Sequence, residues 1–476
     1  MNQEELYIKL KTAIIDGLNF ISKNEEEFFR YNLIDYYDDY PALTYRNTGY
    51  PYFSKSAFVK KKYFRILDKD NFCDESKSWK EFKEYILNHN QYCKFYLLGK
   101  YSEHESELSK TNRDNFFSEY AIKKLIDRYI HLYATKEFVD SNFKALFYEW
   151  YNYFTFSDLQ IDIIVPILMI NFDFEKIEIN DFIAIERMKD IFQKSRNTKT
   201  STNSSPHQEV ISSATHALIL KNFTIKNETY KNISYLNETS IYQKVIVEYI
   251  EKIFAYLRIQ TGKDTGYSQI IARPVNWASS YSADLIPLVI ATTKGYPEYF
   301  ENEYWNYLPD TITLEEIEIE NVKRYLEPQQ RNVLIAINRL NNAFLRRHMD
   351  DSILDITIAL EALFIEASEN TEVTHKLSTR VAILCKLFPL DSFTSFQIFK
   401  ACKSIYSFRS AIIHSKEEKV LDKSRRITST ILPDITSVEA GIKILSHSIK
   451  ILLMNPKFQN IEELDKIIFD DTAKND

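Results

Sequence analysis

Helical periodicity dominates the last third of this chain and limits its fold more than any other sequence feature. From Thr313 onward, apolar residues recur at every third or fourth position, the spacing that gives a helix one apolar face. The pattern repeats in segments at residues 329–347, 350–367, 373–388, 393–414 and 436–455. Most connections between these segments are short, which favours antiparallel neighbours in a bundle. We therefore predict an all-α helical bundle over residues 313–476.

Capping residues indicate where two of these helices begin. Asp350 or Asp351 is suited to cap the second helix, because a short acidic side chain accepts hydrogen bonds from the unpaired N–H groups of a first turn. Before the fifth helix, Thr436 and Glu439 have the spacing of a capping box. These positions predict the bundle's helix boundaries.

The first 312 residues show a mixed pattern. Apolar spacing of three and four predicts helices at residues 4–21, 78–89, 117–133 and 137–157. Runs rich in β-branched residues predict strands at residues 161–174, 178–185, 217–225 and 285–292. We therefore predict an α+β N-terminal region, residues 1–312, with the boundary to the bundle at residues 312 and 313.

Two further segments of this region have distinct patterns. Residues 241–261 predict a helix that ends at Gly262. Its expected buried face consists of Val245, Tyr249, Ile253, Tyr256 and Leu257. Residues 195–206 are polar and of low complexity, which predicts a mobile loop.

The few glycines and cysteines exclude several classes of site. Only seven glycines occur, and the segment from Gly262 to Gly266 lacks the earlier glycine of a phosphate-binding loop, because position 257 is Leu. No GxGxxG motif is present, so we expect no Rossmann dinucleotide site. Four cysteines occur without a CxxC pair, and Cys385 and Cys402 fall on apolar helix faces. We expect buried thiols, no disulfide framework, no metal site and no cofactor.

Charge and hydropathy bound the expected location and partners. The longest apolar run, residues 163–170, is too short to span a bilayer, and the N-terminus lacks the features of a signal peptide. We therefore expect a soluble, cytoplasmic protein without a membrane partner. The chain carries a net charge of −7, but residues 321–476 hold 22 Lys and Arg against 20 Asp and Glu. This mildly basic part permits contact with RNA.

The residues best suited to catalyse a reaction are Arg409 and His414. They lie on the helix that we expect to begin near Asp391 or Ser392 and to end near His414. A guanidinium grips phosphate with two hydrogen bonds and stabilises its charge. An imidazole titrates near neutral pH and can transfer protons. Five residues on a helix place the two side chains about 140° apart, so they meet at one phosphate only where the last turn loosens. The alternative is a surface arginine with a histidine that favours the helix dipole.

The context of this pair resembles the ApeA-like branch of the HEPN superfamily. The resemblance lies in the order of DSILDITIALEALF at residues 351–364, TRVAIL at residues 379–384 and IYSFRSAIIH at residues 405–414. It implies a HEPN-type bundle that forms a homodimer, in which two Arg409 and His414 pairs surround one scissile phosphate. It also implies metal-independent RNA cleavage to a 2′,3′-cyclic phosphate or its hydrolysis product, used in abortive defence against phage.

Two positions depart from the pattern of this family. Ser410 follows the arginine where members often carry Asn, Asp or His, and Ser415 follows the histidine where Gly is common. Neither change removes a proposed catalytic group. We expect Ser410 to support the site.

Glu361 and Arg380 are the other candidate supporting residues. Glu361 has apolar neighbours in the sequence, and a buried carboxylate needs a partner. It can brace Arg409, brace Arg380 or form an intrahelical pair. We expect Arg380 to be structural rather than catalytic, and His375 to be a histidine at a helix start.

These observations favour an RNA endonuclease whose N-terminal region senses a trigger, such as a phage-derived one, or restrains the activity. The alternative is a non-catalytic helical module that dimerises and binds RNA or a partner protein. The presence of both Arg409 and His414 favours the enzyme. The ExK spacing at Glu81 and Lys83 falls in a helical pattern without a paired strand aspartate, so we do not expect a restriction-type nuclease.

Overall fold

The computed structural model describes most of the chain, in which a sheet-containing N-terminal half precedes a helical C-terminal region. The described residues are 3–31, 43–53, 63–97, 106–197, 208–230, 240–278, 290–303, 310–312, 319–346, 348–366, 368–369, 371–414, 418–427 and 435–469. Two compact units divide the chain. Unit 1 comprises Met1–Pro166, Asp181–Gln243 and Gln269–Thr293, and unit 2 comprises Ile167–Asn180, Lys244–Ser268 and Lys294–Asp476. The boundary between residues 312 and 313 stays a prediction.

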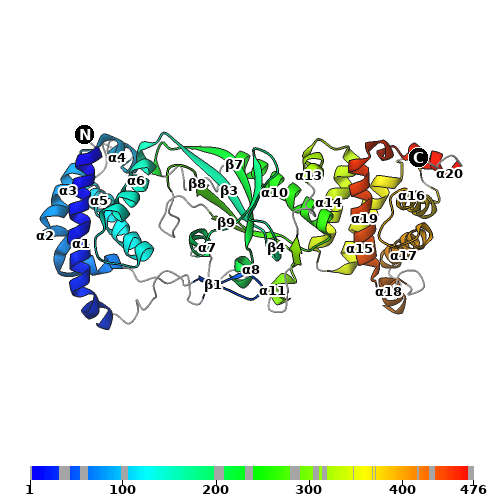
Figure 1. The fold of residues 1–476 in the computed structure, drawn as a ribbon, viewed down its shortest axis with the longest axis horizontal. Helices are drawn as coiled ribbons and strands as arrows, with labels where there is room; N and C mark the ends of the chain where they lie inside the picture. The colour runs from blue at the N-terminus through cyan, green and yellow to red at the C-terminus, as the bar shows by residue number, and fades with distance from the viewer. Residues whose placement is uncertain are drawn as a thin grey trace. The chain divides into compact units, whose positions relative to one another are not determined.

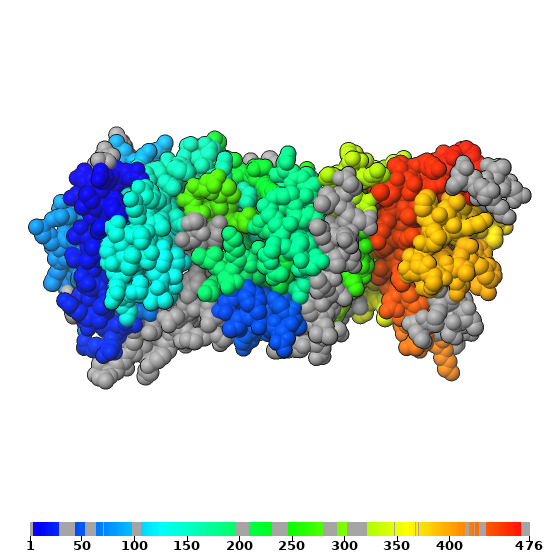
Figure 2. All heavy atoms as spheres, viewed as in Figure 1, coloured from blue at the N-terminus to red at the C-terminus, as the bar shows by residue number. Residues whose placement is uncertain are grey.

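Unit 1 begins with packed helices. α1 (Gln3–Tyr31) contacts α3 (Lys77–Leu87) and α5 (Glu107–Tyr133), and α5 also contacts α6 (Asp140–Thr155) (Figure 1). The buried residues of α1 follow helical spacing: Leu6, Leu10, Ala13, Ile14, Leu18 and Ile21. In the space-filling view, α1 in dark blue lies along the visible surface of these helices (Figure 2). The four predicted helices are therefore confirmed, with α1 and α5 each about ten residues longer than predicted.

Shorter elements complete this helical part. They are β1 (Leu43–Tyr45), β2 (Pro51–Phe53), η2 (Tyr63–Asn71), α2 (Phe72–Glu75) and α4 (Asn90–Tyr96). β1 and β2 pair antiparallel. η2 contacts both α1 and α5, so it belongs to the same packed group.

The sheet of unit 1 runs in the order β6-β7-β3-β8-β9. Its strands are β3 (Asp158–Pro166), β6 (Ile183–Arg187), β7 (His216–Lys226), β8 (Tyr267–Pro274) and β9 (Ile290–Gly295). β3 lies antiparallel to β7 and to β8, with an irregularity against β7 between Ile161 and Ile163. β8 was not predicted, because Ser268, Gln269 and Arg273 interrupt its apolar pattern.

The strand predicted at residues 161–174 is two strands rather than one. β3 ends at Pro166, and β4 (Ile170–Phe172) begins after Met169, whose φ of 62° is left-handed. Proline donates no ladder hydrogen bond and a left-handed residue turns the chain, so the strand cannot continue. The strand predicted at residues 178–185 likewise divides between β5 (Lys176–Glu178) and β6.

The loop predicted at residues 195–206 begins inside a helix. α7 (Asp190–Asn197) includes Ser195 and Arg196, which are 0% and 1% exposed, and α8 (Gln208–Ser212) follows. The guanidinium of Arg196 donates to Gln193 Oε1 at 2.6 Å, to the Ile211 carbonyl at 2.6 Å and to Gln269 Oε1 at 3.1 Å. The prediction was wrong here because a polar sequence pattern indicates exposure to solvent. In the structure, neutral hydrogen-bond acceptors satisfy the guanidinium of Arg196 inside the protein. Residues 198–206 lie outside the described part of the chain.

The long helix predicted at residues 241–261 is α10 (Ser240–Thr261), and most of it belongs to unit 2. Gly262, with φ of 66°, ends it as predicted. Its buried face is formed by Ile250, Ile253, Phe254, Tyr256 and Leu257. Tyr249 is 37% exposed, so its predicted place on that face was wrong. The neighbouring Ile250 is buried in its place.

The remaining elements of unit 2 before the bundle are short. They are β4, β5, α11 (Phe300–Glu303) and β10 (Asp310–Ile312). β10 pairs with β4 in parallel.

The C-terminal helices form the predicted bundle. They are α13 (Ile319–Leu326), α14 (Arg331–Leu345), α15 (Met349–Phe364), α16 (Val373–Leu387), α17 (Ser395–Ile413), α18 (Glu418–Arg425), α19 (Ser437–Met454), η4 (Pro456–Gln459) and α20 (Ile461–Phe469). α14 contacts α15, α16 contacts α17, and α19 contacts both α15 and α17 (Figure 1). A Cβ on Gly441 of α19 would lie 2.9 Å from Ile356 Cγ2 of α15, so a glycine there permits the close approach of these helices.

Helix starts differ from the predictions at two places. His348 is the N-cap of α15. Asp350 and Asp351 lie in the first turn of this helix, where their negative charges interact favourably with the positive end of the helix dipole. Thr394 caps α17 and forms a capping box with Gln397, so neither Asp391 nor Ser392 is its cap.

Two other predicted boundaries are confirmed. The capping box of Thr436 and Glu439 opens α19, and α17 ends at Ile413 with His414 as its C-cap. In the part of the chain that the structure describes, no helix has the length and hydropathy needed to cross a membrane.

Candidate functional site

Arg409 belongs to a three-residue cluster on the bundle. Its guanidinium carbon lies 5.6 Å from the centre of the Tyr406 ring, one turn earlier on α17. The Tyr406 hydroxyl donates a hydrogen bond to Glu361 Oε1 on α15. Tyr406 is only 9% exposed, whereas Arg409 and Glu361 are half-buried. The packing of α15 against α17 therefore brings Glu361 to Arg409 through the tyrosine.

The charges of this cluster are incompletely balanced. Burial raises the pKa of Glu361, and the positive charge of Arg409 opposes that rise. Glu361 was predicted to brace Arg409, brace Arg380 or pair within its helix; it lies with Tyr406 and Arg409. Among the described residues, no carboxylate forms an ion pair with Arg409. The guanidinium can therefore bind an external anion without first breaking such a pair.

His414 lies at the loosened end of α17. It is exposed, its backbone N–H donates to the Ser410 carbonyl at 3.1 Å, and its φ and ψ of −92° and 12° depart from the helix. No contact joins its side chain to Arg409 among the described interactions. Ser410, which lies between Arg409 and His414 in the sequence, is half-buried. The imidazole is thus accessible to solvent.

Arg380 lies in a different cluster. Its guanidinium donates to both oxygens of Asp465 at 2.8 and 2.7 Å, to Glu369 at 2.7 and 3.1 Å, and to the Phe364 carbonyl at 2.7 Å. The hydrogen bond from Arg380 lowers the pKa of Glu369 to about 2. Arg380 is 5% exposed and ties α16 to α20 and to the end of α15. These contacts are typical of a structural arginine.

Other chemically reactive side chains are engaged in packing. The His375 ring lies edge-on to Phe399 at 5.7 Å. Cys385 and Cys402 are buried as predicted, and burial raises the pKa of Cys385 to about 12, which disfavours a thiolate. Glu81 lies in α3, in the predicted helical context. Within the described ranges, no three His, Cys, Asp or Glu side chains gather as a metal site would require.

Sequence reasoning missed the polar role of Tyr406 and the neighbouring cations. The periodicity assigned Tyr406 to the apolar face of its helix, and its ring is indeed buried. Its position three residues before Arg409 was the available signal, because residues one turn apart meet on a helix. Lys400 and Lys403 stand on the same helix and are exposed.

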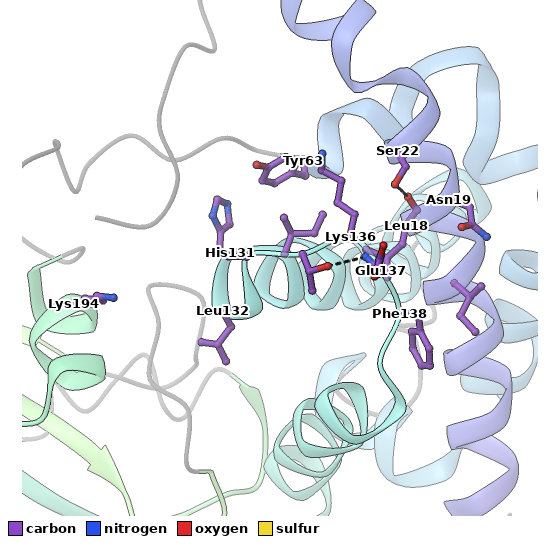
Figure 3. A pocket seen from close by; sticks show the side chains of 14 residues that line it. Leu18, Asn19, Ser22, Tyr63, His131, Leu132, Lys136, Glu137, Phe138 and Lys194 are labelled. Carbon is purple, nitrogen blue, oxygen red and sulfur yellow. Dashed lines mark hydrogen bonds between the residues drawn. The ribbon is translucent and has the colours of Figure 1, made fainter. Parts of the chain in front are cut away.

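A second gathering of polar side chains lines a cavity of about 740 Å³ in unit 1. α1, η2, α7 and the connection from α5 to α6 contribute to it, and Figure 3 shows Lys194 of α7 across from His131 and Leu132 at the end of α5. Its polar lining includes Asn19, Ser22, His131, Lys136, Glu137 and Lys194.

Two of the cavity's basic side chains have acidic neighbours. Lys136 forms an ion pair with Glu25, and burial lowers the pKa of the lysine. His131 Nε2 lies 3.8 Å from Asp127 Oδ1, and the imidazole packs 5.3 Å from the Tyr63 ring. The size and mixed polarity of the cavity suit a small polar molecule. The sequence assigned no role to these residues.

Comparison of the chain with protein-family models, curated proteins and solved structures gives no match.

Proposed function

We propose that this protein is a metal-independent RNA endonuclease of the HEPN type. The observation that supports it best is Arg409, which packs on Tyr406 beside Glu361 and lacks an ion pair among the described residues. The same helix ends at an exposed histidine, His414. Cleavage of RNA by its own 2′-hydroxyl requires a base for the 2′-hydroxyl proton, an acid for the departing 5′-oxygen and a cation that stabilises the charge on the phosphate. Imidazole groups can serve as the base and the acid, and a guanidinium can serve as the cation.

In the proposed reaction, the ribose 2′-oxygen attacks phosphorus and the bond from phosphorus to the 5′-oxygen breaks. One imidazole takes the proton of the 2′-hydroxyl, and another gives a proton to the departing 5′-oxygen. Arg409 stabilises the negative charge on the phosphate oxygens. The products are a 2′,3′-cyclic phosphate and a 5′-hydroxyl. Because each chain offers one His414, the second imidazole comes from the other subunit of a homodimer.

The first 312 residues are proposed to sense a trigger or restrain the nuclease, in the setting of abortive defence against phage. The cavity lined by His131, Lys136 and Lys194 supports a sensing role, because it offers polar groups that the proposed cleavage does not use. The cytoplasm is the expected location of such an enzyme. The competing function is a non-catalytic dimerisation module that binds RNA or protein.

Mapping of RNA ends in cells that express the wild type, Arg409→Ala or Arg331→Ala separates these functions. Arg331 is an exposed arginine on α14 and serves as the matched control. We expect new ends with cyclic phosphate and 5′-hydroxyl groups in the wild type and in Arg331→Ala, but not in Arg409→Ala. The same ends in all three would contradict the proposed nuclease.

A further inference from the structure

The exposed side of α17 has an unusual charge pattern. From residue 392 to residue 416 the sequence contains no Asp or Glu, although the whole chain has more acidic than basic residues. Lys400 and Lys403 lie exposed on this helix. Neither lysine forms an ion pair among the described residues. The helix therefore presents uncompensated positive charge to solvent.

Aromatic rings lie beneath these lysines. Lys400 Nζ is 4.5 Å from the centre of the Phe396 ring, and Lys403 Nζ is 5.1 Å from the centre of the Phe399 ring. The two rings are nearly parallel, with 10° between their planes and 6.5 Å between their centres. Phe396 is 62% exposed, so its ring is open to solvent. We call Phe396, Phe399, Lys400 and Lys403 the α17 face.

The α17 face points toward the same side of the helix as His414. Phe396 and His414 are 18 residues apart. That spacing is about five helical turns, so on an ideal helix their side chains leave in the same direction, about 27 Å apart. Lys403 lies between them on this side, whereas Arg409 leaves the helix about 140° away from it. A ligand that follows the helix from Phe396 therefore reaches His414, one of the two proposed catalytic residues.

We propose that the α17 face binds single-stranded RNA and leads it to His414; this inference rests on the proposed function. Lysine ammonium groups attract the phosphates, and exposed phenyl rings stack on bases of any sequence. A duplex hides the faces of its bases, so stacking on Phe396 selects unpaired nucleotides. The positive charge of a helix without carboxylates disfavours an apolar segment of a second protein, and the exposed Phe396 ring beside the lysines favours stacked bases over an acidic segment.

Binding can be measured separately from cleavage with full-length His414→Ala protein. The probe is a fluorescein-labelled 12-nucleotide single-stranded RNA, followed by fluorescence anisotropy over a range of salt concentrations. Lys400→Glu with Lys403→Glu removes the charge, and Phe396→Ser removes the exposed ring. Lys386→Glu with Lys457→Glu is the matched control, because both lysines are exposed and form no ion pair among the described residues, and Lys457 also lies over a phenyl ring, at 4.7 Å.

We expect the Lys400→Glu and Lys403→Glu pair to weaken binding more than tenfold. It should also reduce the slope of log affinity against log salt by about 1.4, since each phosphate contact contributes about 0.7. Phe396→Ser should weaken binding about fivefold or more with an unchanged slope, because stacking involves no counterion. The control pair should change neither quantity by more than about twofold, and melting curves should match for all variants.

Three results on binding and assembly would overturn this inference. They are equal weakening by the control pair, equal affinity for a duplex of the same length, and loss of dimers by Lys400→Glu with Lys403→Glu in sedimentation. The last result would assign the face to a second copy of the chain. RNA binding through the face without cleavage by the wild type would instead contradict the proposed function alone. If variants of the α17 face cleave RNA as fast as the wild type, this inference is contradicted but the proposed function is not.

Discussion

The guanidinium carbon of Arg409 lies 5.6 Å from the centre of the Tyr406 ring, and the hydroxyl of that tyrosine binds Glu361. This arrangement limits the directions in which Arg409 can point without neutralising it by an ion pair. A cation that is positioned but not neutralised is suited to stabilise a developing negative charge. Tyr406 is therefore a positioning residue in the proposed site.

Arg409→Ala and His414→Ala should each lower RNA cleavage by about 10²-fold or more while the fold survives. Arg409 is half-buried without an ion pair among the described residues, and His414 is exposed. Each substitution should therefore change the free energy of unfolding by less than about 1 kcal/mol. Cleavage of purified RNA and thermal melting test this, with Arg331→Ala as the control. Unfolding of both variants would instead give the pair a structural role.

Glu361→Gln should reduce cleavage without reducing stability at pH 7. Burial raises the pKa of Glu361, so the folded state binds its proton more tightly than the unfolded state. Its contribution to stability is therefore present below its unfolded pKa, about 4.3, and is lost as pH rises through the folded pKa. A neutral glutamine avoids that loss and still accepts the Tyr406 hydrogen bond.

Urea unfolding of wild type and Glu361→Gln at pH 7 and pH 4 checks this sign. The glutamine variant should be equal or more stable at pH 7, and the difference should shrink at pH 4, where glutamate is largely protonated. Cleavage at pH 7 should fall, because glutamine no longer attracts Arg409 and so positions its guanidinium less firmly. A marked loss of stability at pH 7 would show that Glu361 serves the fold.

Arg380→Met should destabilise the bundle by about 3 kcal/mol at pH 7, because Asp465 loses its arginine partner and Glu369 keeps only Lys376. The pKa of Glu369 is lowered to about 2, so its contribution to stability exists above its unfolded pKa, about 4.3, and is lost as pH falls toward 2. The wild type should therefore lose stability over that range. Arg380→Met should lose less on acidification. Urea midpoints from pH 7 to pH 2.5 test both statements, and parallel pH curves would refute them.

Periodicity predicted the bundle because burial of one helix face leaves a trace in the sequence. Val333, Ile337 and Leu340 of α14 are buried with the spacing that the pattern indicated. The end of α17 at His414 was also predictable, since charged residues follow it directly. Helix starts were harder, because Asp350 and Asp351 favour the first turn of a helix as well as its cap.

The candidate site was predictable only along α17 itself. Arg409 and His414 belong to one local motif, whereas the bond from Tyr406 to Glu361 depends on how α15 meets α17. Periodicity tells which face of a helix is buried but not which side chain lies opposite. For the same reason it placed Arg196 in a loop, since the carbonyl groups that bury this arginine come from residues distant in sequence.

RNA cleavage should persist in EDTA. The proposed reaction assigns charge stabilisation to Arg409 and proton transfer to His414, so none of its steps requires a metal. Purified wild-type protein is incubated with total RNA with and without the chelator, and Arg409→Ala reports any contaminating nuclease. Activity that disappears in EDTA and returns with magnesium would refute the mechanism.

The protein should act as a homodimer in which both copies of His414 lie near the two-fold axis. In-line attack needs proton-transferring groups on opposite sides of phosphorus, and one exposed histidine at the end of α17 cannot occupy both. A two-fold interface presents the same residues twice, so one His414 can act as base while its symmetry mate acts as acid.

Mixing His414→Ala subunits with Arg409→Ala subunits tests the shared site. The mixed dimer keeps one histidine and one arginine around the phosphate, so it should recover part of the activity that each parent lacks. Mixing two preparations of the same variant is the control. Sedimentation at micromolar concentration gives a simpler check. A monomer with full activity would contradict the prediction, because the proposed site needs residues from two subunits.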